Sequence, residues 1–343
     1  MILALVEHDG VRPDTLSLEA LALGRRLAAG LGVPLEAVIF AAGAGAGGGD
    51  GAGARADAVA AQLGAQGVSR VVLVEHDRLD DYAPDAWAAS LVQVASARSA
   101  GVLLAAATDR GNELLAGAAA RLGVPMAANC TDVRPGGRFE VTRQRWGGSL
   151  LEDARLDGGV KLLTVAAHAF AADGSAGQGA GATSTGEPAV ERFTPSLAAA
   201  ELRVRIVERV PRDPGTVSLA DARVVVGGGR GVGSAEGFAI LEELARLLGG
   251  AVGVSRVVTS AGWRPHAEQV GQTGQRIAPE LYIACGISGA IQHMVGAKSA
   301  KRILAINTDR DAPMVSKATY AVIGDLHAVV PALNAEVRRV TGR

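Results

Sequence analysis

Short apolar runs alternate with stretches of helical periodicity along the first half of the chain. The apolar runs are "ILALVEH" (2–8), "LEAVIF" (35–40), "RVVLVEH" (70–76) and "GVLLAAAT" (101–108). Helices are expected between them, from a cap at Ser17 to Gly30 or Gly32, over Arg55–Leu63 and Trp87–Ala97, and up to Leu122. Apolar runs this short and continuous, separated by helices, indicate parallel strands buried on both faces.

Two later pieces extend this sheet. "RFEVTRQRW" (138–146) and "VKLLTVAAHAF" (160–170) are expected to join it as antiparallel strands. Glycine-rich segments at 41–54 and 172–188 contain no defined turn, so we expect surface loops there rather than phosphate-binding loops.

The alternation of strands and helices starts again near residue 222. The strands expected there are "ARVVVGG" (222–228), "AVGVSR" (251–256), "LYIACGISG" (281–289), "KRILAINTD" (301–309) and "TYAVIGD" (319–325). A helix follows the first of them, with Phe238, Leu241, Leu244 and Leu248 on one face. Residues 201–222 carry a further expected strand and two prolines, which suit a domain boundary. We therefore predict an α/β chain of two doubly wound domains with mainly parallel sheets, residues 1–205 and 206–343.

Polar side chains follow the strands expected in the second half. They are Arg230, Ser255 with Arg256, Ser288, Asn307 and Asp325. Each lies at the carboxyl end of an expected parallel strand, which is the edge where ligands bind in open α/β sheets. The pattern therefore predicts one binding site at this edge.

The first of these strand ends, "VVVGGGRGVGSAEGF" (224–238), lacks the glycine spacing of a dinucleotide-binding turn. It instead holds a lone cation, Arg230, among glycines at the corner between strand and helix. In "GISGAIQHM" (286–294), Ser288 is expected to cap a short helix whose first amides belong to Gly289, Ala290 and Ile291.

Two further features near this site have alternative interpretations. His293 would lie one turn after the Ser288 cap and face the same crevice, or it is an ordinary surface or core histidine. The glycine-punctuated loop at 268–280 either approaches a ligand with its backbone or merely connects two elements.

Composition narrows the class of protein. The chain has 343 residues, 48% hydrophobic and 20% charged, and a net charge near −1, which fits a soluble protein and argues against a nucleic-acid surface. Its two cysteines, Cys130 and Cys285, are too few for a disulfide framework or a thiolate metal cage. We see no signal peptide, transit peptide or membrane-spanning run, and expect a cytoplasmic protein that is not embedded in a membrane.

Other conspicuous residues are expected to be structural. "VEHD" occurs at 6–9 and 74–77, but alternation along a strand separates its Glu and His, so no metal site is expected. Cys285 is interpreted as a buried residue ending a strand. Trp146 and Trp263 suit either a partner interface or the core.

The segments "GGGRG", "QVGQTGQ", "APELYIACGISGAIQHM", "AIN" and "GDLHAVVP" occur in an order and spacing that resembles one family. They are similar to the FAD-binding domain of electron transfer flavoprotein alpha subunits, densely from Val224 to Leu333 and more loosely before that. The resemblance implies that the second domain is Rossmann-like and binds FAD, and that the first contacts a beta subunit in a heterodimer.

The resemblance also implies roles for individual residues. Arg230 would serve the phosphate–ribityl region of FAD, and Ser255 and Arg256 would lie close to the isoalloxazine. Val270, Gly271, Gln272 and Thr273 would lie along the flavin edge. Ser288, Gly289, Ala290, Ile291, Gln292 and His293 would form the helix start at the cofactor, with His293 directed at the pyrimidine carbonyl. Asn307, Asp325 and Leu326 would contact the adenosine end.

A cation such as Arg256 and a donor such as His293 beside the ring would favour the negative charge of the reduced flavin. The chain departs from the family pattern at Thr308, where Lys is frequent, and at Ser260, where Asp is frequent. Both departures are interpreted as changes at the surface or behind the residues that contact the cofactor, which leave FAD binding intact.

The function implied is that of an electron carrier without a catalytic residue of its own. Donors would be flavoprotein dehydrogenases such as those of acyl-CoA dehydrogenase type, and the acceptor a membrane or soluble oxidoreductase such as a quinone reductase. One alternative is the alpha subunit of an electron-bifurcating complex that oxidises NADH, and another is a nucleotide-binding module that has lost its flavin.

Overall fold

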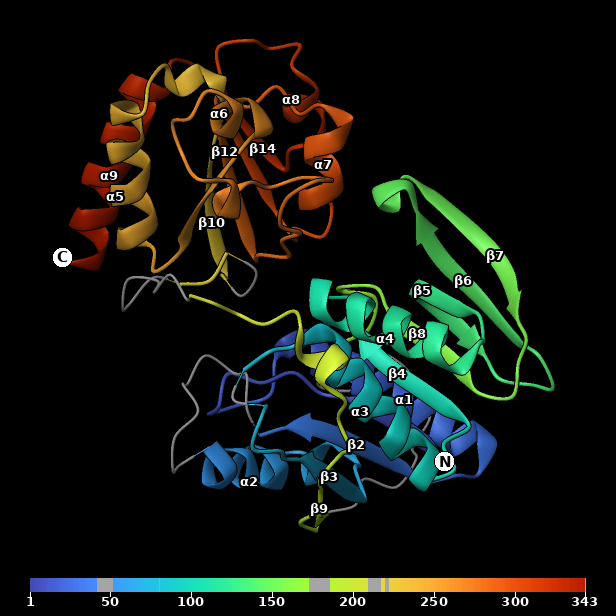
Figure 1. Cartoon of the computed structure of the whole chain (residues 1–343). Helices are drawn as coiled ribbons and strands as arrows, with labels where there is room; N and C mark the ends of the chain where they lie inside the picture. The colour runs from blue at the N-terminus through green and yellow to red at the C-terminus, as the bar shows by residue number, and fades with distance from the viewer. Residues whose placement is uncertain (42–51, 80, 173–185, 209–216, 220–221, 343) are drawn as a thin grey trace. The chain divides into compact units, whose positions relative to one another are not determined.

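The computed structural model of the chain describes residues 1–41, 52–79, 81–172, 186–208, 217–219 and 222–342 (Figure 1). The chain divides into two compact units, which are treated separately below. Unit 1 comprises Met1–Trp146 and Leu150–Val210, and unit 2 comprises Gly147–Ser149 and Pro211–Arg343. The division falls inside residues 209–216, outside the described residues, so the boundary at 205 and 206 stays a prediction.

Unit 1 is built on one mixed sheet. Its strands are β1 (Ile2–Leu5), β2 (Leu35–Phe40), β3 (Arg70–Val74), β4 (Val102–Ala106), β5 (Met126–Arg134), β6 (Phe139–Arg145), β7 (Leu150–Leu156), β8 (Lys161–Val165) and β9 (Ala189–Phe193). Within the described residues the strand order is β7-β6-β5-β8-β4-β1-β2-β3-β9. Only the pairs β5–β6 and β6–β7 are antiparallel among these described strands. The pair β6–β7 forms the long hairpin that Figure 1 draws in green.

Helices cover both faces of this sheet. They are α1 (Thr15–Leu31), α2 (Ala52–Gln62), α3 (Pro84–Ala97) and α4 (Asp109–Leu122), with short 3₁₀ turns η1 (Gly64–Gln66), η2 (Trp146–Gly148) and η3 (Ala199–Leu202). Leucines and alanines of α1 and α2 pack in one core, and those of α3 and α4 pack in the other. Unit 1 is therefore doubly wound, as the alternation of short apolar runs and helices predicts.

At α1 the predicted N-cap residue, Ser17, is wrong, and one of the two predicted C-terminal residues, Gly32, is confirmed. The helix is capped by Asp14, whose carboxylate accepts a hydrogen bond of 2.9 Å from the Leu16 amide. The expected cap, Ser17, is wrong, because its hydroxyl accepts from the Glu7 amide at 3.0 Å instead. Gly32 ends the helix in the left-handed conformation with φ 64°, where a residue without Cβ is least strained.

Two strand predictions also need correction, and one strand was not predicted. β8 is parallel to β4 and β5, so the expected antiparallel arrangement of 160–170 is wrong. All five residues of β8 are buried, which is typical of a central parallel strand. The strand expected at 201–222 is absent from the described part of that segment, which contains only the end of η3. The sequence pattern also missed β9.

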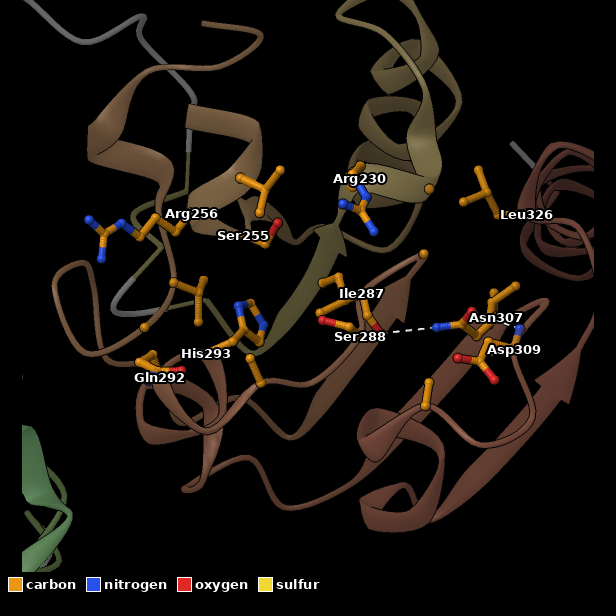
Figure 2. A pocket seen from close by; sticks show the side chains of 18 of the residues that line it. Arg230, Ser255, Arg256, Ile287, Ser288, Gln292, His293, Asn307, Asp309 and Leu326 are labelled. Atoms are coloured by element: carbon orange, nitrogen blue, oxygen red, sulfur yellow. Dashed lines mark hydrogen bonds between the residues drawn. The ribbon is translucent and has the colours of Figure 1, made fainter. Parts of the chain in front are cut away.

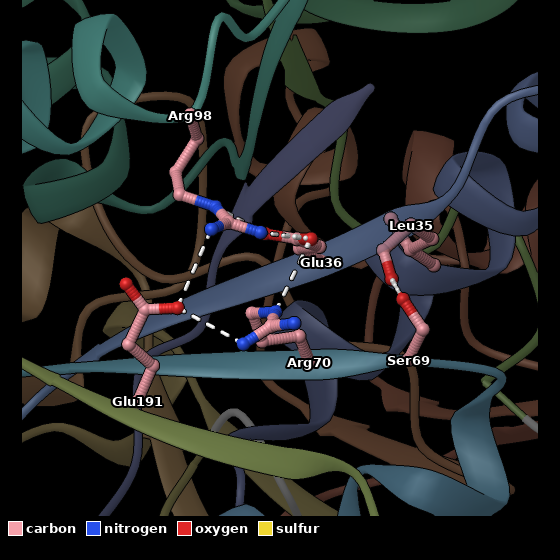
Figure 3. Close-up of polar contacts among 6 residues, drawn as sticks. All are labelled: Leu35, Glu36, Ser69, Arg70, Arg98 and Glu191. Atoms are coloured by element: carbon pink, nitrogen blue, oxygen red, sulfur yellow. Dashed lines mark hydrogen bonds and ion pairs between the residues drawn. The ribbon is translucent and has the colours of Figure 1, made fainter.

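The sequence of β9, AVERF, is neither a continuous apolar run nor an alternating pattern, and its side chains are exposed or only half-buried. Backbone pairing with β3 and ion pairs of Glu191 tie it to the sheet. Glu191 of β9 lies 3.0 Å from Arg70 and 3.3 Å from Arg98. Both arginines also pair with Glu36 of β2, whose side chain is only 5% exposed (Figure 3). We call these four residues the Glu36 cluster.

Unit 2 contains a five-stranded sheet within the described residues, and all its strands are parallel. The strands are β10 (Val224–Gly228), β11 (Ala251–Val254), β12 (Leu281–Cys285), β13 (Ile303–Asn307) and β14 (Tyr320–Ile323), in the order β11-β10-β12-β13-β14. The helices are η4 (Arg230–Val232), η5 (Glu236–Phe238), α5 (Ala239–Leu247), α6 (Arg256–Ser260), η6 (His266–Glu268), α7 (Ile291–Ala297), α8 (Pro313–Lys317) and α9 (Leu326–Thr341).

Helices pack on both faces of this second sheet (Figure 1). α5, α6 and α9 contribute to the core on one face, and α7 and α8 to the core on the other. From β10 the chain crosses to β11 on one side and then to β12 on the other side. The strand order therefore reverses between β10 and β12, and a crevice is expected outside their carboxyl ends. The α/β class with two mainly parallel sheets is confirmed.

Among the described residues, no helix has the length and apolar character needed to cross a lipid bilayer. The glycine-rich segments at 41–54 and 172–188 lie mostly outside the described residues.

Candidate functional site

A cavity of about 680 Å³ opens at the carboxyl ends of the five strands of unit 2 (Figure 2). This volume is within the range of small-molecule and cofactor sites. Residues that follow all five strands line it, as the polar strand ends predict. The predicted site residues that line it are Arg230, Ser255, Arg256, Val270, Gly271, Gln272, Thr273, Ser288, Ala290, Gln292, His293, Asn307, Asp325 and Leu326.

Gly289 and Ile291 are the two predicted residues outside the described lining. Gly289 has φ +81°, and a Cβ on it would lie 2.4 Å from the Met314 amide nitrogen. It therefore serves the close approach of this loop to α8. The Ile291 side chain is 69% exposed at the start of α7.

Arg230 is held at the cavity by a tight contact between the ends of β10 and β12. The Gly231 amide donates to the Gly286 carbonyl at 3.1 Å, and a Cβ on Gly229 would lie 2.2 Å from that same oxygen. Only glycine allows the two backbones to approach so closely. Arg230 follows this contact as the first residue of η4, and its side chain reaches toward the middle of the pocket (Figure 2).

Arg256 supplies a second cation, from the end of β11. Ser255 takes the N-cap position of α6, and Arg256 is the first residue of that helix. Within the described residues, the side chains of Arg230 and Arg256 make neither a hydrogen bond nor an ion pair. Two exposed guanidinium groups beside one cavity are therefore available to an anionic ligand.

The loop at 269–275 forms one wall of the cavity. Gln269, which the sequence analysis did not single out, is 2% exposed and connects the loop to α6. Its carboxamide accepts from the Thr259 hydroxyl at 2.6 Å and donates to the Thr273 hydroxyl at 3.0 Å. The Gln272 amide donates to the Gln292 carbonyl at 2.8 Å, which connects the loop to α7. The position of Gln269 in "EQVGQTGQ" could have identified it as a site residue, but the sequence does not show that its side chain is buried.

The expected cap at Ser288 is wrong. α7 begins at Ile291, and its N-cap position is Ala290 without a side-chain hydrogen bond. The Ser288 carbonyl instead accepts from the Met314 amide at 3.0 Å. The left-handed turn at Gly289 separates Ser288 from the helix, which explains why the spacing misled.

His293 is both a core histidine and a cavity residue. It is 6% exposed, and its Nε2 lies 2.7 Å from the hydroxyl of Tyr282 in β12. Nδ1 has no well-formed hydrogen bond within the described residues, although the Val270 carbonyl is near enough to act on the ring. Burial lowers the pKa of His293 to about 4, so the ring is neutral at pH 7.

Asn307 and Leu326 lie on the opposite side of the cavity (Figure 2), and Asp325, next to Leu326 in the chain, also lines it. The Asn307 carboxamide donates to the Ile287 carbonyl at 3.0 Å and so joins the ends of β12 and β13. Asp325 caps α9, its carboxylate accepting from the His327 amide at 2.9 Å. Asp309, another lining residue, was not singled out because it follows Asn307 by two positions in an ordinary turn.

The cysteines, the first "VEHD" segment and the tryptophans lie outside the cavity lining. Burial raises the pKa of the Cys130 and Cys285 thiols to about 12. In the first "VEHD" segment, Glu7 accepts from the Thr108 hydroxyl and His8 Nε2 pairs with the Phe40 carbonyl. The described residues contain no group of His, Cys, Asp and Glu arranged to hold a metal ion. Trp146 is 76% exposed and Trp263 packs partly against the α5–α6 core.

The cavity suits a ligand that has both anionic groups and an extended apolar part. Arg230 and Arg256 supply unpaired positive charge, and buried Val270, Ile287 and Leu326 supply apolar walls. Glycine contacts bring backbone groups close to the ligand space near Arg230. A dinucleotide with a pyrophosphate and flat rings has this combination of groups, so the described residues fit such a cofactor.

Comparison with protein families agrees with this site. Residues 2–198 match the electron transfer flavoprotein domain, and residues 218–298 match the electron transfer flavoprotein FAD-binding domain. The second match contains the ends of β10, β11 and β12 and the loop at 269–275. FAD is thus the cofactor of the domain family to which unit 2 belongs.

Individual relatives extend over almost the whole chain. The electron transfer flavoprotein subunit alpha of Mycobacterium tuberculosis is 38% identical and covers 99% of both chains. Protein FixB of Clostridium saccharobutylicum is 34% identical over 95% of this chain and 92% of its own. Protein FixB of Bradyrhizobium diazoefficiens is 35% identical over 97% and 86%. The chain belongs to the electron transfer flavoprotein alpha subunit family.

Proposed function

We propose that the cavity of unit 2 binds FAD and that the chain, paired with a beta subunit, carries electrons between flavoproteins. The observation that carries this proposal is the convergence of all five strand ends on one cavity that has two unpaired arginines. Domain 1–205 would contact the beta subunit, domain 206–343 would hold FAD, and the heterodimer would be cytoplasmic.

The two sides of the cavity suit the two ends of FAD. Arg256, Gln272, Thr273 and His293 would lie at the isoalloxazine, and Asn307, Asp325 and Leu326 at the adenosine. Arg230 lies between these sides in Figure 2, which supports a role at the phosphates and the ribityl chain. The binding surface would be completed by the remaining lining residues Ser255, Val270, Gly271, Ser288, Ala290 and Gln292. Gly289 would act by shaping the loop before α7, and Ile291 by beginning that helix.

Bound FAD supplies reversible electron transfer, and the chain's own residues would set how easily the ring accepts negative charge. The Arg256 guanidinium beside the ring would stabilise that charge electrostatically. His293 would contribute as a neutral hydrogen-bond donor, because burial keeps its pKa near 4. The buried walls around Val270 and Ile287 would exclude water and strengthen both interactions.

Electrons would come from a flavoprotein dehydrogenase, such as one of acyl-CoA dehydrogenase type. They would pass to a membrane or soluble oxidoreductase such as a quinone reductase. This carrier role needs no catalytic residue in the chain itself.

The alternative is the alpha subunit of an electron-bifurcating complex that oxidises NADH. It is supported by "IQHMVGA" (291–297) and "GDLHAVVP" (324–331), which resemble forms paired with specialised or bifurcating systems. In that case this chain would pass one electron onward while the beta subunit binds NADH at a second flavin.

The test is the absorption spectrum of the heterodimer after co-expression with its beta subunit. One FAD per heterodimer, with AMP as the second nucleotide, is the expected result for the carrier. Two FAD per heterodimer and reduction by NADH would instead favour the bifurcating complex. A folded heterodimer without flavin bands, even after incubation with FAD, would overturn both.

A further inference from the structure

The buried hydroxyl of Tyr282 lies directly behind the ring of His293. Tyr282 is fully buried in β12, and His293 packs above it from α7 with ring centroids 6.1 Å apart. The tyrosine oxygen and His293 Nε2 are 2.7 Å apart, a normal hydrogen-bond distance. This contact is not part of the cavity lining, and the function proposed above assigns it no role.

The direction of this hydrogen bond follows from the partners that each group has. Within the described residues the Tyr282 hydroxyl hydrogen has Nε2 as its single acceptor. If Nε2 carried the proton instead, the buried phenol would keep an unpaired O–H, and the bare Nδ1 would face the Val270 carbonyl. A buried unsatisfied donor is costly, so the arrangement in which tyrosine donates is favoured.

We propose that Tyr282 is a positioning residue that donates its hydroxyl hydrogen to His293 Nε2 and thereby keeps the ring proton on Nδ1. The effect of Tyr282 on FAD binding rests on the proposed function, whereas the hydrogen bond between Tyr282 and His293 does not depend on it. It specifies that Nδ1 is the one ring nitrogen of His293 that carries a proton to donate. It also leaves Arg230 and Arg256 as the positive groups of the cavity, because a neutral His293 adds none.

Close packing fixes both partners in place. A Cβ on Gly227 of β10 would lie 2.3 Å from the Tyr282 oxygen, so glycine is required where the hydroxyl passes the neighbouring strand. A Cβ on Gly296 of α7 would lie 2.3 Å from the Gly271 amide nitrogen, so the helix that carries His293 sits against the cavity loop. The phenol of Tyr282 is therefore tightly enclosed, and the backbone that carries His293 is held against the loop at 269–275.

The first test is the tautomer of His293 in the full-length chain without flavin, measured by NMR after labelling its six histidines with ¹⁵N. The His293→Asn variant assigns the resonances by subtraction. We expect the protonated nitrogen to be Nδ1 and the unprotonated one Nε2. A protonated Nε2 would overturn the proposal, whatever the protein's affinity for FAD.

The second test compares Tyr282→Phe with Tyr320→Phe in the heterodimer. Tyr320 is 66% exposed on β14 and does not line the described cavity, so it is a matched control for loss of a phenol hydroxyl. Tyr282→Phe should raise the FAD dissociation constant about three- to tenfold and mix the two His293 tautomers. Tyr320→Phe should leave both unchanged.

A double variant separates positioning from general stability. In the His293→Asn background, adding Tyr282→Phe should change FAD affinity by less than about twofold, because the group that Tyr282 positions is already missing. An undiminished effect of Tyr282→Phe in that background would contradict the proposal. If wild type and every variant fail to bind FAD, the proposed function fails, while the tautomer still tests the hydrogen bond.

Discussion

At the scale of single residues, the cavity combines two kinds of polar group with different physical behaviour. Arg230 and Arg256 are exposed, so salt screens the long-range effect of their guanidinium groups. His293 is buried and neutral. Charge for an anionic ligand therefore comes from exposed side chains that line the cavity, and a directed hydrogen bond from a buried one.

Replacement of Arg256 with Ala should reduce the fraction of bound flavin that stops at one-electron reduction during photoreduction. The lost guanidinium no longer stabilises the negative charge, and the first reduction potential should fall by roughly 30–60 mV, about 1 kcal/mol for one electron. Arg246→Ala, at an exposed position of α5 outside the described lining, is the matched control. An unchanged yield for Arg256→Ala would remove Arg256 from the flavin site.

Acidification should destabilise the wild-type chain more than the His293→Asn variant. The pKa of His293 falls from 6.5 to about 4 on folding, so between these pH values the unfolded chain binds more protons than the folded one. This contribution is present above pH 6.5 and is lost as pH falls toward 4. It amounts to about 3 kcal/mol in the free energy of unfolding.

Urea unfolding at pH 7 and near pH 4 measures this difference. The two curves should diverge only on the acid side of pH 6.5. Parallel pH profiles for wild type and His293→Asn would show that the pKa of His293 is not lowered by folding.

At the scale of helices and strands, the structure uses ion pairs where apolar burial is insufficient. β9 has no fully buried side chain and lies at the edge of the unit 1 sheet, paired with β3. The Glu36 cluster connects β9 to β2, β3 and the end of α3 (Figure 3). Glu36 and Glu191 pair with the same two arginines but differ in burial, so comparing them isolates the effect of burial on an ion pair.

Glu36→Gln should lower the free energy of unfolding by about 3 kcal/mol, and Glu191→Gln by less than about 1 kcal/mol. The Glu36 side chain is 5% exposed, and its loss leaves Arg98 partly buried without its nearest counter-charge. The Glu191 side chain is 38% exposed, so water replaces much of its interaction. Chemical unfolding of both variants measures the two values, and equal losses would contradict the dependence on burial.

At the scale of the whole molecule, the two doubly wound sheets differ in the residues that lie where their strand order reverses. In unit 1 the strand order reverses between β1 and β4, where the Thr108 hydroxyl donates to Glu7 and closes the gap with the chain's own groups. In unit 2 the reversal between β10 and β12 carries glycines and Arg230, and the cavity opens there. The same architecture therefore forms a ligand cavity in unit 2, whereas in unit 1 side chains of the protein bond to each other at the corresponding place.

FAD binding should slow amide hydrogen exchange in unit 2 and leave the described strands of unit 1 unchanged. Binding stabilises the folded form of the element that contacts the ligand, and all described lining residues belong to unit 2. Exchange measured by mass spectrometry in the flavin-free and flavin-loaded heterodimer tests this. Slower exchange at β1 and β4 would indicate a second flavin contact that the cavity does not explain.

Much of the fold could be predicted because its signals are local. Continuous apolar runs identified the central strands, and helical periodicity identified α2, α3 and α4 to within a few residues. The hairpin of β6 was predicted correctly as antiparallel. β8 was assigned the wrong direction, because the apolar pattern of a strand does not specify its neighbours. β9 was missed because Arg70 and Arg98, which hold it, are distant in sequence.

By itself the sequence determined the α/β class, the positions of the polar strand ends and the resemblance to flavoprotein alpha subunits. Each depends on the order of residues along the chain. Only the tertiary structure decided that Ser288 does not cap α7, that Gln269 is buried in the cavity wall, and that Tyr282 lies behind His293. These depend on backbone turns and on contacts between separate elements, which take their geometry from the packing of the whole sheet.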